Sequence, residues 1–534
     1  MAFADLHCHP AFWSFNNKQN DPDNHIWNIV LTKKQRKLKT KGKRATYSQA
    51  DFASLTSGDV KLVFASLYPV EKGFFMGNRD TGINADVVGG LLNQVIPGTP
   101  GFLRRIASAV LRPLSKVFSV AINNEGWARD ILQKMVMNFS RDRINYFQDH
   151  KYHYFSEMQS EYAFYLKHEN LAPQAPAPVG TKPYQLVRTP VDLAQAIADP
   201  NKIAVVLTIE GAHAFVLDQD PQSNDYLTLA PDQQIQARIR TLKDEWKIFF
   251  ITFSHHYSNH LAGHAHSLPK LLTEITNQQP LINSGFLPLG ETYIRQLLSI
   301  TADNAPDPGQ GRRILIDVKH FSARSRKDYY DRIIIPYNRA NPNDLIPVIA
   351  SHCGYYGQIQ TVSKVDLSYL AGKAANEGDD DIIHGFYRWN INLCDEDVQV
   401  IVESEGLIGL SFDQRIMGEK NVKNKSIEYW IDVMGRHIVG MVVASINNVA
   451  QNPERIWNSL CIGTDFDGII DPLDPFSTSE KFGVFKTELR RFLETIAQRH
   501  GSYLFLNGNP FTPDQVVEKI AYRNAHDFVI KHFK

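Results

Sequence analysis

The stretch Phe3-Ala4-Asp5-Leu6-His7-Cys8-His9 decides the fold of this chain. It is a short, mostly apolar run that ends at Pro10, which predicts a buried β-strand. Alternate side chains of a strand point to the same side, so His7 and His9 can share one metal ion at the end of this strand, while Cys8 faces the other way and packs. The strands of a (β/α)8 barrel present ligands in this manner. Taken alone, the pair is equally compatible with metal binding and with packing.

Eight short β-rich runs of this kind recur along the chain, with helical patterns between them. The runs cover residues 3–9, 60–68, 203–210, 248–255, 314–320, 347–352, 407–412 and 461–465. Amphipathic helical patterns cover residues 291–300, 395–405, 429–449, 484–499 and 513–533. Eight strands alternating with helices predict an α/β fold, a (β/α)8 TIM-type barrel, formed as a single domain over residues 1–534.

The interval between the second and third runs is about 130 residues, far longer than one βα unit needs. It predicts a helical insertion at about residues 75–190. The insertion holds a basic amphipathic stretch at 103–118, an aromatic-rich helix around 146–155 and a proline-rich loop at 173–183. A lid or dimerisation arm over the barrel mouth, which would make a homodimer, and a hairpin packed on the barrel side are equally good interpretations.

Composition limits the class of protein. The 534 residues carry zero formal net charge, so no global field favours nucleic acid or an anionic membrane. The basic run at 33–44 has no interleaved aromatic residues and is interpreted as a solvated loop. The four cysteines are scattered without a Cys-x-x-Cys motif, which favours a reducing, cytoplasmic setting. No room precedes His7 for a signal peptide, and no apolar run approaches the roughly 18 residues of a membrane span.

Histidines and carboxylates stand at the ends of six of the eight predicted strands. They are His7 and His9 on the first, Glu210 on the third, His255 on the fourth, His320 on the fifth, His352 on the sixth and Asp465 on the eighth. Side chains from different strands converge at the carboxyl end of a barrel. The recurrence therefore predicts a divalent-metal site with a small-molecule substrate, rather than isolated strand caps.

The segments around these residues resemble the renal (membrane) dipeptidase family of amidohydrolases. Ile209-Glu210-Gly211-Ala212-His213 is similar to its Glu-Gly-x-His segment, and Ile316-Asp317-Val318-Lys319-His320-Phe321-Ser322 to its Ile-Asp-Leu-x-His-x-Ser. Phe253-Ser254-His255, Pro347 to His352 and Gly463-Thr464-Asp465-Phe466-Asp467-Gly468 match further segments in order. The resemblance covers nearly all predicted strands but not the insertion.

The resemblance implies a binuclear zinc amidohydrolase that cleaves the amide bond of a dipeptide or related N-acyl amino acid with a metal-bridged hydroxide. One metal would bind His7 and His9, and the other would bind His320 and His352. Glu210 would bridge the two divalent ions, most commonly Zn²⁺. Asp465, beside the metals, would shuttle the proton, and His255 would bind the substrate carbonyl oxygen. Arg388, in Arg388-Trp389-Asn390, would hold the substrate carboxylate.

The first strand departs from the family pattern. Mammalian members have His-x-Asp there, and the histidine found here lowers the negative charge of the site by one. Asp5-Leu6-His7-Cys8-His9 also resembles the opening of related barrel phosphoesterases and nucleases, but their late Asp-x-His is replaced by Asp465-Phe466-Asp467-Gly468. The remaining alternative is a non-catalytic barrel used for partner binding. That alternative predicts a missing ligand, and none is missing.

Overall fold

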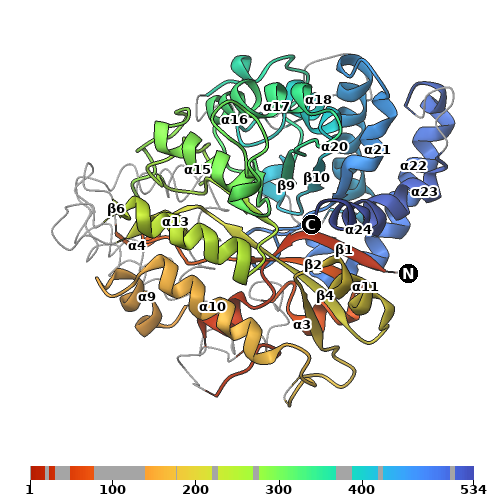
Figure 1. Cartoon of the computed structure of the whole chain (residues 1–534). Helices are drawn as coiled ribbons and strands as arrows, with labels where there is room; N and C mark the ends of the chain where they lie inside the picture. Colours follow the sequence, from red (N-terminus) through yellow and green to blue (C-terminus); the bar gives the residue numbers. More distant parts are fainter. Residues whose placement is uncertain are drawn as a thin grey trace, which may run out of the picture.

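The computed structural model describes residues 2–17, 23–29, 48–76, 139–175, 177–218, 227–268, 273, 276–367, 386, 388–418, 425–504 and 511–533. At its centre is a parallel sheet in the order β1-β2-β4-β7-β8-β9-β10-β11, and helices surround it (Figure 1). The last strand returns to the first, since the Asp465 N–H donates to the His7 carbonyl at 2.9 Å and the His9 N–H to the Phe466 carbonyl at 2.9 Å. The predicted (β/α)8 TIM-type barrel is confirmed.

All eight predicted strands are present. They are β1 (Phe3–Cys8), β2 (Val60–Leu67), β4 (Ile203–Glu210), β7 (Phe250–Thr252), β8 (Leu315–Asp317), β9 (Ile349–Cys353), β10 (Leu407–Leu410) and β11 (Leu460–Ile462). β2 and β4 are buried along their whole length, as expected of parallel strands covered on both faces. Several strands end before the predicted boundary, because His255, His320 and Asp465 lie in the loops that follow the last ladder pair.

The helices pack around this sheet. They are α1 (Phe12–Asn16), α3 (Phe52–Ser57), α4 (Gly73–Met76), α9 (Arg141–Gln148), α10 (Tyr154–His168), α11 (Pro190–Ala198), α12 (His213–Val216), α13 (Asp232–Arg240), α15 (Pro288–Leu298), α16 (Ala323–Tyr329), α17 (Ile335–Ala340), α18 (Asp395–Glu403), α19 (Gln414–Met417), α20 (Ile427–Asn448), α21 (Ile456–Ser459), α22 (Phe482–Leu504), α23 (Pro513–Glu518) and α24 (Asn524–His532). The predicted C-terminal helix is formed by α23 and α24, joined by a π-helical turn at Lys519–Arg523. None of the described helices is long and apolar enough to cross a membrane.

The interior of the barrel is layered. The lower layer is apolar, and every strand contributes to it, including Ala4 and Leu6 of β1 and Phe250 of β7. Phe528 and Phe533, from α24 and the residue after it, close this end of the barrel. The register between β1 and β2 shifts between Asp5 and Cys8, as at a β-bulge. The shift explains how β1 directs both Leu6 and His7 inward.

The described part of the insertion packs against the barrel. The predicted aromatic helix is two helices, α9 and α10, because residues 149–153 break the helical ladder. The Glu161 carboxylate of α10 accepts the Tyr68 N–H at 2.9 Å, just after β2. An unpredicted strand, β3 (Tyr184–Val187), follows the proline-rich segment and pairs with β4 in parallel. The basic stretch at 103–118 and the basic run at 33–44 lie outside the described residues.

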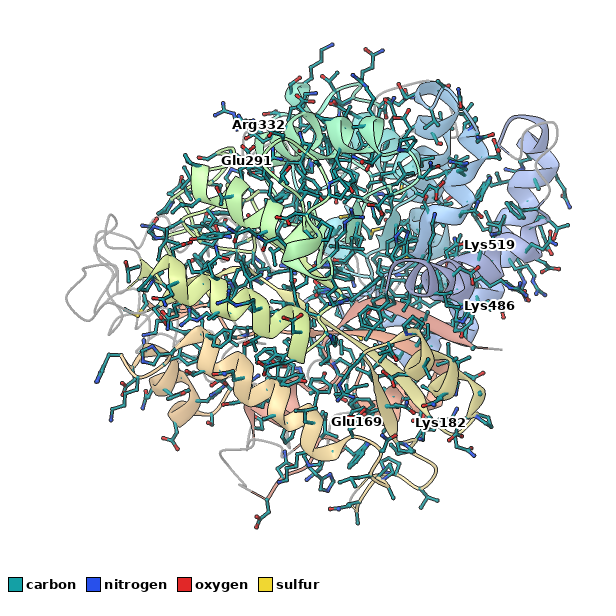
Figure 2. All side chains as sticks on the ribbon, viewed as in Figure 1. Glu169, Lys182, Glu291, Arg332, Lys486 and Lys519 are labelled. Atoms are coloured by element: carbon teal, nitrogen blue, oxygen red, sulfur yellow. The ribbon has the colours of Figure 1, made fainter. Side chains whose placement is uncertain are left out.

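Charged side chains cover the outer surface of the helices (Figure 2). Glu291 and Arg332, both labelled in that view, form an ion pair of 3.2 Å between carboxylate and guanidinium. Exposed pairs of this kind contribute between zero and about 1 kcal/mol each. The stability of the fold therefore rests on the buried core.

Candidate metal centre

The six residues predicted for the metal site come together at the carboxyl ends of the strands. They are His7, His9, Glu210, His320, His352 and Asp465, each no more than 9% exposed. Two sets of ligand atoms meet here: His7, His9, Glu210 and Asp465 in one, and Glu210, His320 and His352 in the other. Within each set the atoms lie within 4.8 Å of one another. Glu210 belongs to both sets, as a bridging ligand must.

The distances fit ligands that surround an ion rather than partners in hydrogen bonds. The Nε2 atoms of His7, His320 and His352 lie 3.4, 3.7 and 3.8 Å from Oε1 of Glu210. Two ligand atoms that each lie about 2.0 Å from a tetrahedral zinc ion are about 3.3 Å apart. The Nε2 atom of His9 approaches the other oxygen, Oε2 of Glu210, at 3.0 Å. The two carboxylate oxygens thus face different histidines.

Several buried ring nitrogens of this cluster have no hydrogen-bond partner among the described residues. They are both nitrogens of His7, Nε2 of His9, Nδ1 of His320 and Nε2 of His352. A buried polar atom without a partner costs free energy. Bound divalent ions would supply that partner to the nitrogens that face Glu210. The donor set of four imidazoles and a carboxylate suits Zn²⁺.

Two of the histidines are oriented by partners behind them. Nδ1 of His9 lies 3.1 Å from the Ser66 carbonyl, so it carries the hydrogen and leaves the Nε2 lone pair for a metal. Nδ1 of His352 lies 2.8 Å from the Ser351 hydroxyl, which donates to Asp317 at 2.5 Å. Asp317 also accepts from the Thr252 hydroxyl at 2.5 Å. This polar layer supports the site from below.

Burial and charge set the protonation of the cluster. Burial lowers the pKa of His7, His320 and His352, so these imidazoles are neutral, as metal ligands must be. Burial opposes ionisation of Glu210, but the facing imidazoles of His255 and His7 outweigh it and hold its pKa well below the usual range. Glu210 is therefore ionised and faces the neutral imidazoles of His7, His320 and His352. Burial opposes protonation of His9, but the Glu210 carboxylate raises the pKa of His9 above its usual value.

The pKa of the Asp465 carboxyl is shifted in the opposite direction to that of Glu210. Burial and the nearby Glu210 carboxylate raise the pKa of Asp465 well above its usual value. Its Oδ1 lies 3.8 Å from Nε2 of both His7 and His9, and its Oδ2 lies 3.7 Å from Nε2 of His352. Two nearby carboxyls with opposite shifts are the arrangement in which one binds and the other carries a proton.

The backbone at two of these residues is held in an uncommon conformation. His320 has a φ of 66° and Asp465 a φ of 62°, in the left-handed region. A Cβ atom at Gly468 would lie 2.0 Å from Oδ1 of Asp465. Only glycine at position 468 therefore leaves the carboxylate in place. Such conformations persist where the surrounding structure enforces them, as at functional sites.

His255 lies beside the metal cluster between two carboxylates. Its Nδ1 is 2.6 Å from Oε2 of Glu71, and its Nε2 is 3.4 Å from Oε1 of Glu210. Burial works against protonation, but Glu71 and Glu210 raise the pKa of His255 to about 10. The imidazole therefore keeps a proton that it can donate from Nε2. Glu71 also accepts the Tyr257 N–H at 3.0 Å, which fixes the carboxylate.

The pairing of Glu71 with His255 predicts a pH-dependent stability. Burial opposes the shift, yet His255 lowers the pKa of Glu71 to about 2. The stabilisation from Glu71 is present above its unfolded pKa of about 4.5 and is lost as the pH falls toward 2. The stabilisation from His255 is present below about pH 6.5, its pKa in the unfolded chain, and is lost as the pH rises toward 10. The ion pair therefore stabilises the fold most between about pH 4.5 and 6.5, the pKa values of Glu71 and His255 in the unfolded chain.

We expect Glu71→Gln to lower the melting temperature most near pH 5.5 and least near pH 10. Turnover should also fall, by about 10- to 100-fold, because His255 loses the partner that orients it. Thermal unfolding of both proteins at pH 5.5, 7.5 and 10 measures the first effect, with Glu169→Gln, whose carboxylate pairs with Arg188 far from the site, as the control. A melting-temperature difference that is the same at all three pH values would contradict the ion pair.

A cavity opens above the cluster. It is lined by Phe74, His255, His256, Ser267, Leu268, Lys319, His320, His352, Ile391, Asp413, Arg415, Ile416, Asp465, Gly468 and Ile469. The predicted clamp, Arg388, is half-buried and is not among these residues. The guanidinium that lines the cavity is that of Arg415, whose Nε lies 2.8 Å from Oδ2 of Asp413. A larger hollow, around Arg312, lies at the other end of the barrel and includes none of the clustered ligands.

Sequence patterns alone missed several residues that line or support the cavity. Glu71 follows β2 by four residues, so it is not at the predicted strand end. Asp413 and Arg415 follow β10, the one later strand without a predicted ligand. Lys319 stands next to His320 in a position that the family motif leaves variable. Only its place between Asp317 and His320 signalled that it faces the same interior.

No protein-family model matches this chain. No curated protein matches it. Among solved structures, a metallopeptidase named dipeptidase AC is 12% identical, with 100% of this chain and 99% of that chain covered and a TM-score of 0.47. A metallopeptidase from Rhodobacter sphaeroides, bound to a phosphinate mimic of the dipeptide L-Ala-D-Ala, is 12% identical over 100% and 99% of the chains, with a TM-score of 0.46.

The probable dipeptidase PvdM from Pseudomonas aeruginosa is also 12% identical, over 91% of this chain and 88% of that chain, with a TM-score of 0.37. At this level of identity and TM-score, the function of the chain has to be argued from its own residues. Dipeptidase AC is named as a member of peptidase family M19, the renal-dipeptidase-like family that the strand-end motifs of this chain resemble.

Proposed function

We propose that this protein is a metal-dependent hydrolase that cleaves the amide bond of a dipeptide or related N-acyl amino acid at a binuclear zinc centre. The observation that carries the proposal is the approach of four buried imidazoles to the two oxygens of one ionised carboxylate, Glu210. His7 and His9 would hold one ion and His320 and His352 the other. Each half of the site then has two imidazoles and shares the Glu210 carboxylate.

Two divalent ions held here would make a bound water acidic and polarise the amide carbonyl of the substrate. The remaining chemistry belongs to side chains of the chain. Asp465, within 3.8 Å of ligand atoms of both sets, accepts the proton of the attacking water and donates it to the leaving amine. Burial and the Glu210 carboxylate raise its pKa, which suits a group that must hold a proton during the reaction.

His255 stabilises the negative charge that develops on the carbonyl oxygen. Because Glu71 holds its Nδ1 at 2.6 Å, its Nε2 can point toward Glu210 and the substrate. A protonated imidazole is a stronger donor than a neutral one. Glu71 acts only through His255 and is a positioning residue. The carboxylate of the leaving amino acid would meet a guanidinium, for which Arg415 lines the cavity and Arg388 remains the sequence-based prediction.

Removal of the metal tests this proposal. The purified protein should contain about two divalent ions per chain, and chelation should reduce hydrolysis of dipeptides and N-acyl amino acids by at least about 1,000-fold. Added Zn²⁺ should restore it. The measurements are elemental analysis and amine release over a panel of such amides, with an aryl phosphate as the comparison substrate. Phosphate-ester turnover without amide turnover would favour the phosphoesterase alternative. A protein that holds no metal and cleaves neither kind of substrate would contradict a metal-dependent hydrolase.

A further inference from the structure

Lys319 lies inside the reaction chamber. It stands two residues after Asp317, whose side chain faces the barrel interior, and directly before the ligand His320. Its side chain is 1% exposed, and it lines the same cavity as His320, His352 and Asp465. Lysine is rarely buried to this extent unless it is paired. Its place in the chamber therefore calls for a partner.

No partner for the Lys319 ammonium exists among the described residues. Nζ of Lys319 is buried and makes no hydrogen bond or ion pair in the described part of the chain. Two carboxylates that lie close to Lys319 in the sequence or line the same cavity are already engaged. The Asp317 carboxylate accepts from Ser351, Thr252 and the backbone N–H of Lys319 itself. Asp413 is bound by the guanidinium of Arg415.

Other buried lysines in this protein show what a satisfied ammonium looks like. Lys243 is also 1% exposed. Its Nζ donates to the Gln296 carbonyl at 2.5 Å, the Ser299 hydroxyl at 2.8 Å and the Gln310 carbonyl at 2.9 Å. Nζ of Lys72 donates to the Asp149 carbonyl at 2.7 Å. Lys319 differs from both because it lines the cavity and its buried ammonium has no surrounding carbonyls as hydrogen-bond partners among the described residues. A ligand in the cavity is the partner that remains.

The charge balance of the chamber favours an anionic ligand. His255 already lies between Glu71 and Glu210, and Arg415 is matched by Asp413. Two divalent ions held by this site would bring four positive charges, more than the carboxylates of Glu210, Asp465 and Asp317 could balance, and the Lys319 ammonium would add one more. A free α-ammonium beside the reacting carbonyl would therefore be repelled.

We propose that Lys319 binds an anionic group on the acyl part of the substrate, so that the preferred substrate is an N-acyl amino acid with a carboxylate on its acyl chain. A dipeptide, whose acyl part carries an ammonium, is the disfavoured class. Lys319 adjoins His320 and is 1% exposed, whereas Arg415 is 8% exposed and lies nearer the mouth of the barrel. We therefore assign Lys319, the deeper of the two residues, to the acyl part of the substrate. The assignment of the substrate class rests on the proposed amide hydrolysis. The binding of an anion by Lys319 does not depend on it.

Binding of succinate tests the anion site without turnover. Calorimetric titration of the metal-loaded protein with succinate should give binding that Lys319→Met weakens by at least about tenfold, with metal content unchanged. Lys364→Gln removes an exposed lysine elsewhere and should bind succinate like the wild type. Equal affinity in Lys319→Met, or no succinate binding to the wild type, overturns the proposal.

Uncharged succinamide extends the test to the wild-type protein, in case Lys319→Met does not fold. It should bind at least about tenfold more weakly than succinate, and equal binding overturns the anion site.

Hydrolysis of matched amides tests the substrate class. N-succinyl-, N-acetyl- and glycyl-alanine share the leaving amino acid and differ only in acyl charge. We expect kcat/KM to be highest for the succinyl compound and lowest for the glycyl compound, and Lys319→Met should reduce the preference for succinyl over acetyl. A preference for the glycyl compound overturns the assignment. If no amide is cleaved, the proposed function fails, while the succinate titration still decides whether Lys319 binds an anion.

Discussion

Replacement of Glu210 by glutamine should remove both metal ions of the proposed binuclear centre at once. Among the residues that the structure describes, Glu210 is the one carboxylate whose oxygens face all four histidines, with Nε2 distances from 3.0 to 3.8 Å. An amide has one oxygen acceptor instead of two and no negative charge, so it cannot bridge two cations. The four imidazoles would then lose the anion that all of them face. We expect zinc affinity to fall by at least about 100-fold and amide turnover by at least about 1,000-fold.

Zinc titration followed by elemental analysis measures the first effect directly, without reference to any substrate. Glu157→Gln is the matched control, because Glu157 is also buried but pairs with Arg143 in the insertion. It should lower thermal stability and keep the metals. Retention of two tightly bound ions by Glu210→Gln would show that the carboxylate is not the bridge. Loss of only one ion would restrict its role to one half of the site.

The barrel itself could be predicted from the sequence because its signal is spread over the whole chain. Eight apolar runs of strand length, separated by helical patterns, leave few other folds, and each run was found within a few residues of its predicted position. The short strand β3 was missed, since Tyr184–Val187 follows a proline-rich segment and is only four residues long. Its pairing with β4 depends on tertiary contacts that no local pattern records.

The clustering of the candidate metal-site residues was predictable for a related reason. Each lies at or just after a strand end, where the barrel fold alone dictates that side chains converge. The residues that tune the site were not predictable in this way. Glu71 reaches His255 from a loop four residues beyond β2, and Arg415 enters the cavity from the segment after β10. Loop paths are decided by packing, so the family resemblance pointed to Arg388, whereas Arg415 lines the cavity.

The protonation states of Glu210 and Asp465 also could not be predicted from the spacing of residues in the sequence. Glu210 and Asp465 are both buried carboxyls at strand ends, and nothing in the sequence separates their roles. In the structure the imidazoles of His255 and His7 face Glu210 and keep it ionised. Asp465 faces Glu210 itself, and this like charge together with burial raises its pKa. The geometry of one carboxyl thus sets the chemistry of the other.

Asp465→Asn should therefore separate metal binding from catalysis. Asparagine keeps the shape and an oxygen toward His7 and His9, but it cannot accept the proton of the attacking water or return it to the leaving amine. General acid–base groups contribute about 100- to 10,000-fold to rates, and we expect a loss of kcat in that range. The succinate affinity and the metal content should stay close to those of the wild type, because Glu210 and the four histidines are unchanged.

Asp467→Asn provides the control two residues further along the same loop. The Asp467 carboxylate accepts from the Trp13 indole at 3.1 Å and from the Ala50 N–H at 2.9 Å, and it does not line the cavity. Its replacement should lower the melting temperature and leave kcat largely intact. The decisive comparison is the pH profile of kcat, since loss of a proton-carrying group removes a limb of the profile while a structural change lowers it uniformly. An unchanged profile and rate in Asp465→Asn would exclude the shuttle and transfer the role to another group at the cavity wall.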